Sequence, residues 1–170
     1  YGTTRTVVRP LLDRLIQDEG LHIELRDEGL FDAQGLGDFD AVLCLGLVYH
    51  FRDPQYVLDW LSQLNFVSLF VSTQTGPGEG FELTNRRDPR IGLPEWFWKD
   101  RTDSLSGWHP THVLFRHMLE WAGFHSVKSL TPEMAFPAKP LPGLTNSAYF
   151  RAERGASIDP IAVRHAYLQY

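Results

Sequence analysis

Residues 39–54, Phe-Asp-Ala-Val-Leu-Cys-Leu-Gly-Leu-Val-Tyr-His-Phe-Arg-Asp-Pro, decide the fold of this chain. The apolar run 41–45 predicts a short strand that is buried on both faces, as in a parallel sheet. Gly46 ends this strand at a point where a ligand can approach the backbone closely. Tyr49 and His50 follow at the strand's carboxyl end, which is where open α/β sheets bind their ligands. The stretch therefore predicts a buried strand that leads into a ligand-facing loop.

Asp53 and Pro54 predict that a helix begins directly after this loop, with Asp53 as the cap and Pro54 at the first helical position. The helix is expected over 54–64, and its apolar face comprises Tyr56, Val57, Trp60, Leu61 and Leu64. The remaining predicted elements are a helix over 5–19 with Pro10 in its first turn, strands at 21–25, 66–71, 124–130 and 145–152, a helix from Pro110 to Trp121, and a helical tail from Pro160.

Strands that alternate with helices are typical of a parallel α/β sheet, and the last two strands, which have no helix between them, suggest an antiparallel edge. We expect strand 40–45 to be central and parallel to strand 66–71. One domain is expected over 1–155, followed by a helical tail over 156–170. The segment 76–108 is too long for an ordinary connection and is predicted to be a substrate or lid loop.

The composition is that of a globular protein, with 43% hydrophobic and 22% charged residues among 170. The net charge of −5 argues against bulk electrostatic binding of nucleic acid. The single cysteine, Cys44, lies inside the apolar strand, so we expect it to be buried and the compartment to be reducing, which suggests a cytoplasmic location. No apolar run approaches the length of a membrane span, and no membrane association is expected.

The stretch 39–54 resembles a segment of class I S-adenosylmethionine (SAM)-dependent methyltransferases, and most closely the group that includes the tRNA uridine-5-oxyacetic acid-type enzymes. In that group the segment reads Phe-Asp-x-Val-x-x-x-Gly-Val-Leu-Tyr-His-x-x-x-Pro. A second similarity begins at Trp108-His109-Pro110-Thr111 and continues through Ala122-Gly123-Phe124. The resemblance implies a Rossmann-like sheet and methyl transfer from SAM to a small molecule or an RNA nucleoside. A homo-oligomer would be compatible with it.

The resemblance also implies roles for individual residues. Leu45 and Gly46 would lie along the cofactor, and Tyr49 would lie near the transferred methyl group. Asp27 and Glu28 correspond to the place where the family often holds the adenine amino group with an acidic side chain; the alternative is that they form a solvated turn. His50 is either a proton acceptor or a cap of the following helix.

The long loop contains the candidate substrate residues. Its aromatic side chains either line a substrate pocket or fold back on the core, and its arginines either bind an acidic substrate or are solvated. The substrate-binding residues predicted here are Trp96, Trp98, Arg101 and Trp108. A metal site is not expected, because His109, His112 and His117 share a helix face poorly and no cysteine or carboxylate cluster joins them.

The chain departs from the family in one large respect. The family's first strand, its Gly-rich cofactor loop and the acidic residue that holds the ribose have no counterpart in this sequence. Gly35 and Gly37 precede a strand rather than follow one, and the cluster 76–80 opens the long loop, so neither fits a cofactor loop. We therefore expect the N-terminal strands to lie upstream of Tyr1 in the same protein; the alternatives are a partner or a rearrangement that fills their place in the sheet. A non-catalytic methyltransferase-like scaffold, or one subunit of a heteromer, is the alternative.

Overall fold

The computed structural model describes residues 2–33, 35–85, 88, 107–131 and 147–154. Contacts divide the chain into two compact units, Tyr1–Gly35 and Leu36–Tyr170, which are described separately below. The single domain expected over 1–155 stays a prediction. The expected tail helix lies outside the described residues.

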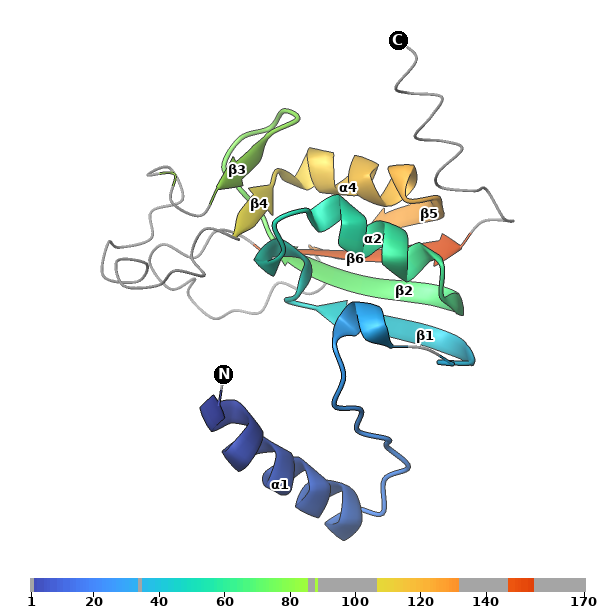
Figure 1. The fold of residues 1–170 in the computed structure, drawn as a ribbon. Helices are drawn as coiled ribbons and strands as arrows, with labels where there is room; N and C mark the ends of the chain where they lie inside the picture. Colours follow the sequence, from blue (N-terminus) through green and yellow to red (C-terminus); the bar gives the residue numbers. More distant parts are fainter. Residues whose placement is uncertain (1, 34, 86–87, 89–106, 132–146, 155–170) are drawn as a thin grey trace. The chain divides into compact units, whose positions relative to one another are not determined.

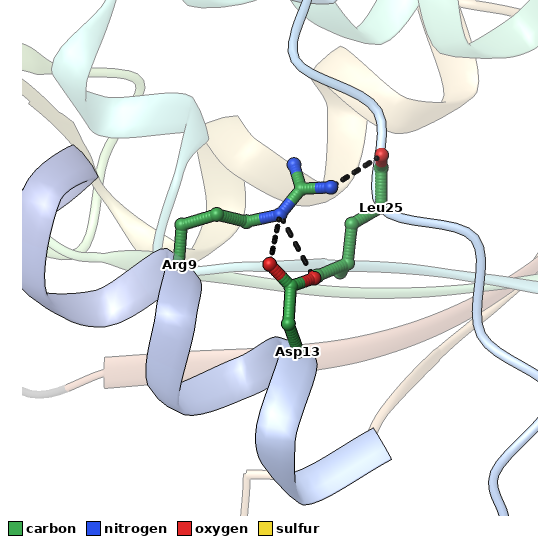
Figure 2. Close-up of polar contacts among 3 residues, drawn as sticks. All are labelled: Arg9, Asp13 and Leu25. Atoms are coloured by element: carbon green, nitrogen blue, oxygen red, sulfur yellow. Dashed lines mark hydrogen bonds and ion pairs between the residues drawn. The ribbon is translucent and has the colours of Figure 1, made fainter. Parts of the chain in front are cut away.

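The first unit consists of helix α1 (Gly2–Asp18), an extended stretch and a short 3₁₀ helix, η1 (Leu30–Asp32). The guanidinium of Arg9 fixes the extended stretch to the helix. Its Nε donates to Asp13 Oδ1 at 3.1 Å, and its Nη2 donates to the Leu25 carbonyl at 3.3 Å (Figure 2). Pro10 lies inside the helix and not in its first turn, so that prediction was wrong.

The strand predicted at 21–25 is not formed, because these residues have no regular structure. A strand needs a neighbour to bond with, and none of the described strands pairs with this stretch. No described side chain between 8 and 33 is buried, and Leu11 and Ile23 are among the exposed apolar ones. Residues 21–25 therefore alternate between apolar and polar side chains as a strand would, but they do not belong to a sheet of the described strands.

The second unit is built on a four-stranded sheet in the order β1-β2-β6-β5. Its strands are β1 (Asp38–Leu45), β2 (Asn65–Gln74), β5 (Phe124–Ser129) and β6 (Ser147–Arg154). β1 and β2 are parallel, as predicted, whereas β6 is antiparallel to both β2 and β5. The antiparallel C-terminal strand is thus confirmed, but the described strands form a mixed sheet and not a mostly parallel one.

β1 was predicted to be central and buried on both faces, and among the described strands it is neither. It is the edge of the sheet, with only β2 beside it. Leu43 and Leu45 point to one face and are 69% and 57% exposed, while Cys44 points to the other face and is buried. The apolar run was interpreted correctly as a strand, but the described part of the chain covers only one of its faces.

Helices α2 (Pro54–Ser62) and α4 (His112–Trp121) lie together over one face of this sheet (Figure 1). Asp53 caps α2 by accepting from the Tyr56 amide at 3.2 Å, and Pro54 is its first residue, as predicted. The buried face of α2 includes Leu58, which the helical pattern had not selected, whereas Tyr56 is 52% exposed.

The core lies between these helices and the sheet. Its largest fully buried side chains from the sheet and α4 are Leu69, Phe115, Leu119, Phe124 and Phe150. The described part of the second unit places no helix on the opposite face. There a cavity of about 120 Å³ opens among Leu43, Leu45, Phe70, Leu130 and Tyr149.

A second sheet of two described strands lies within and just after the segment predicted as a lid loop. It pairs β3 (Leu83–Asn85) with β4 (Trp108–Pro110) in antiparallel register. The sequence had not predicted it, because each strand is only three residues long. No helix in the described part of the chain is long and apolar enough to span a membrane.

Candidate functional site

The candidate site lies at the carboxyl ends of the parallel strands β1 and β2. Gly46 follows β1 directly and adopts a left-handed backbone conformation with φ of +67°, which glycine reaches without steric cost. Its amide donates to Ser72 at the end of β2, to the hydroxyl Oγ at 2.9 Å and to the carbonyl at 3.3 Å. This turn sends the chain into a short 3₁₀ helix, η2 (Val48–His50).

η2 presents the two side chains that the sequence singled out. The rings of Tyr49 and His50 lie side by side, with centroids 4.3 Å apart. Tyr49 is partly buried and His50 is exposed. The Tyr49 hydroxyl folds back over the turn, since it lies 3.9 Å from the position that a Cβ on Gly46 would take. The N-cap of α2 is Asp53, so the structure does not assign that role to His50.

A third ring, that of His109, completes the cluster from β4. Its centroid is 5.8 Å from that of Tyr49, with the planes inclined by 48°, and the side chain is fully buried. β4 is held against the end of β2 because the Gly76 amide donates to the Pro110 carbonyl at 3.0 Å. The Tyr49 ring therefore lies close to two imidazoles, of which that of His50 is exposed and that of His109 is buried.

Sequence reasoning missed two residues of this site. His109 had been weighed only as a metal ligand, and Ser72 had not been singled out. The Trp-His-Pro-Thr similarity was a usable signal for His109, since it marks the residues that return to the sheet after the long loop. Nothing in the sequence around Ser72 distinguishes it from Ser68, the other serine of β2.

Two of the three histidines that invited a metal interpretation have polar partners of their own. His112 Nε2 lies 3.1 Å from Ser129 Oγ, and His117 Nδ1 lies 3.0 Å from Glu120 Oε2. No group of three or more His, Cys, Asp or Glu side chains that could hold a metal ion is found in the described part of the chain. Burial, reinforced by the charge of Arg116, lowers the pKa of His112.

Cys44 lies in β1, two residues before the Gly46 turn, on the face covered by the helices. It is buried, as predicted, and burial raises the pKa of its thiol to about 11. Because the thiolate is the reactive form, the thiol at this position is inert at neutral pH. Cys44 is therefore a core residue and not a nucleophile of the site.

The other predicted site residues are not brought together by the structure. Asp27 and Glu28 belong to the first unit, where Glu28 pairs with Arg26 at 3.2 Å, so their role toward a cofactor stays a prediction. Trp108 lies in β4 next to His109. The predicted substrate residues Trp96, Trp98 and Arg101 lie outside the described residues.

The chain matches no family model, and no curated protein sequence matches it. Solved structures do resemble it. The N-terminal domain of EvdMO1, crystallised in the presence of SAH and D-fucose, is 19% identical with a TM-score of 0.55 over 84% of this chain and 60% of that domain. An O-methyltransferase family protein from Burkholderia thailandensis is 15% identical with a TM-score of 0.55 over 88% of this chain and 42% of that one.

The same EvdMO1 domain with SAH bound gives a TM-score of 0.52 at 19% identity, over 84% of this chain and 59% of that domain. At these identities the similarity shows the fold alone. The chain has a mixed α/β fold that it shares with structures that include an O-methyltransferase family protein and an SAH-bound domain. It spans about 60% of the length of the EvdMO1 domain.

Proposed function

We propose that this chain is part of a SAM-dependent methyltransferase that acts on a small molecule or an RNA nucleoside. The observation that carries the proposal is the left-handed Gly46 turn, which presents Tyr49 and His50 at the carboxyl ends of two parallel strands. Ligands of open α/β sheets bind at this position. The fold shared with an SAH-bound domain supports SAM as the cofactor.

The residues present fit the edge of such a cofactor site. Leu45, at the end of β1, is 57% exposed and next to the Gly46 turn, so it offers apolar surface to a ligand. SAM supplies a methyl group that is already activated on a sulfonium sulfur. The protein would therefore contribute mainly by aligning the acceptor with the methyl group and by accepting or donating a proton.

In this proposal Tyr49 and His50 are the side chains that meet the acceptor. SAM, when bound, would supply the electrophilic methyl group and would keep the electron pair of the broken carbon–sulfur bond on sulfur, while these side chains would hold the acceptor atom facing the methyl carbon. An acceptor that carries a proton would lose it, and the imidazole of His50, which is exposed, would take it. Tyr49, whose ring lies close to two imidazole rings, orients the acceptor or the cofactor.

The open edge of β1 also belongs to the proposal. A parallel strand placed beside β1 would be followed by a crossover helix, and such helices cover the faces of parallel sheets. The exposed face of Leu43 and Leu45 would then be covered. A strand and helix of this kind would come from outside the described chain, together with the Gly-rich loop and the acidic ribose ligand. The complete sheet would then be mostly parallel.

Calorimetry on the protein at its full natural length tests the proposal, with SAM and SAH as ligands. A ligand at about 100 times its Kd stabilises a protein by about 2.7 kcal/mol, which is roughly 5–10 °C in melting temperature for a domain of this size. Leu45→Arg should abolish the binding heat. Val67→Arg is the matched control, because Val67 is exposed to a similar extent at the opposite end of β2.

The alternative is a non-catalytic scaffold, and the open apolar face of β1 is the observation that favours it. A scaffold would use that face to bind another subunit and would give neither binding heat nor a thermal shift with SAM or SAH. That result at saturating ligand would refute the methyltransferase proposal. Binding of either ligand that is lost in Leu45→Arg and retained in Val67→Arg would support it.

A further inference from the structure

Ser72 is a buried hydroxyl at the end of β2 that the sequence analysis did not select. It is 7% exposed and pairs with Leu45 across the parallel ladder. Its side-chain oxygen accepts the Gly46 amide at 2.9 Å, and its own carbonyl accepts the same amide at 3.3 Å. The first residue after β1 is therefore bonded twice to a single residue of the neighbouring strand.

This contact acts on the backbone that carries the candidate site. Gly46 has φ of +67°, and the chain enters η2 two residues later. The Tyr49 hydroxyl lies over Gly46, at 3.9 Å from the position that a Cβ there would occupy. A shift of the Gly46 peptide therefore moves the backbone beneath the Tyr49 ring.

A second serine of the same strand shows that burial alone does not make this contact. Ser68 also lies on the face of β2 opposite the helices and is likewise 7% exposed. Its hydroxyl accepts from Arg151 Nη2 at 3.3 Å, near the start of the strand. The two serines lie on the same face of the same strand and are equally buried. They differ in their hydrogen-bond donors, which are the Gly46 amide for Ser72 and the Arg151 guanidinium for Ser68.

The geometry points to Ser72 as a positioning residue, whose hydroxyl fixes the Gly46 turn and through it the placement of Tyr49 for ligand binding. The inference rests on the proposed function for its ligand and on the Gly46 contact for its structure. Ser72 itself does not contact the reacting atoms. Its effect is expected on the affinity for SAM and SAH, with a much smaller effect on the fold.

The test compares Ser72→Ala with Ser68→Ala in the protein at its full natural length. SAH affinity is measured by calorimetry, and exchange of the Gly46 amide proton is measured by NMR. Ser72→Ala should weaken SAH binding by about 2- to 10-fold, as expected for the net worth of one hydrogen bond, and should speed exchange of the Gly46 amide by a similar factor. Ser68→Ala should change neither, and Ser72→Thr, which retains the hydroxyl, should restore both.

The two measurements separate failure of this inference from failure of the proposed function. If the unaltered protein does not bind SAH, the proposed function fails, and Gly46 exchange alone decides whether Ser72 holds the turn. Equal exchange of Gly46 in Ser72→Ala and Ser68→Ala would overturn the inference. So would an SAH affinity of Ser72→Ala equal to that of the unaltered protein.

Discussion

Replacing Gly76 by alanine tests the packing beneath the candidate site. A Cβ added to Gly76 would lie 2.7 Å from the His109 carbonyl oxygen and 3.1 Å from Thr84 Oγ1. The first of these atoms belongs to the backbone of β4, so it can yield only if the strand moves. That movement would lengthen the bond from the Gly76 amide to the Pro110 carbonyl, which is now 3.0 Å.

The expected cost follows from these contacts. Overpacking costs about 1–3 kcal/mol, and the weakened hydrogen bond adds about 1 kcal/mol. The reduced freedom of the unfolded chain returns about 0.4–1 kcal/mol when glycine becomes alanine. Gly76→Ala should therefore lower the free energy of unfolding by about 1–3.5 kcal/mol. Because β4 carries His109, the SAH affinity should fall as well.

Gly80→Ala is the matched control, because Gly80 lies four residues along the same loop and a Cβ there would meet nothing within 4 Å. Gly80→Ala should leave the free energy of unfolding unchanged or raise it by up to about 1 kcal/mol. Urea unfolding followed by tryptophan fluorescence measures both variants against the unaltered protein. A Gly76→Ala midpoint equal to that of Gly80→Ala would show that β4 is not held at the observed distance, and the reasoning would be refuted.

Three further predictions follow from the described contacts. Tyr49→Phe should lower the single-turnover rate by about 30- to 150-fold if its hydroxyl aligns a reacting group; a normal rate with a lowered melting temperature would assign Tyr49 to the core. Burial raises the pKa of the Cys44 thiol from 9.0 to about 11. Alkylation of Cys44 at pH 8 should therefore be about 100-fold slower than alkylation of a free thiol, and it should accelerate when urea unfolds the protein. Labelling of the folded protein at the free-thiol rate would contradict the observed burial. Burial and Arg116 lower the pKa of His112 from 6.5, so the folded protein should lose stability as the pH falls below 6.5. The melting temperature should therefore fall less between pH 7 and pH 5 in His112→Asn than in the control His125→Asn. Equal falls in the two variants would contradict the prediction.

The sequence predicted elements whose signals are local. Asp53 and Pro54 began α2 as expected, because a capping carboxylate and a proline at the first position act within one turn. Thr111 likewise caps α4 by accepting from the Leu114 amide at 3.2 Å. β1 and β2 were found because continuous apolar runs predict strands whatever lies beside them.

The predictions from the sequence were wrong where the structure of a segment depends on a second segment that pairs with it or covers it. The stretch 21–25 alternates like a strand but lacks a partner among the described strands, so its pattern is not realised. Leu43 and Leu45 belong to a run that predicts burial on both faces, although only the face of Cys44 is covered in the described structure. At the site, Tyr49 and His50 were found because they follow the strand directly. His109 was missed because the pairing of two three-residue strands brings it there.

The strand order has a consequence for how the chain is made. β6 lies between β2 and β5, and it supplies the buried side chains Ala148, Phe150 and Ala152. β6 is also the last of the described strands to be synthesised. The sheet edges of β2 and β5 that pair with β6 therefore stay unpaired until residue 154 has been added. During that interval β2 has only β1 as a neighbour, and β5 has none among the described strands. Contacts of such long sequence separation form slowly, and unpaired strand edges invite aggregation. The nascent chain should therefore depend on chaperones most between the synthesis of β5 and that of β6.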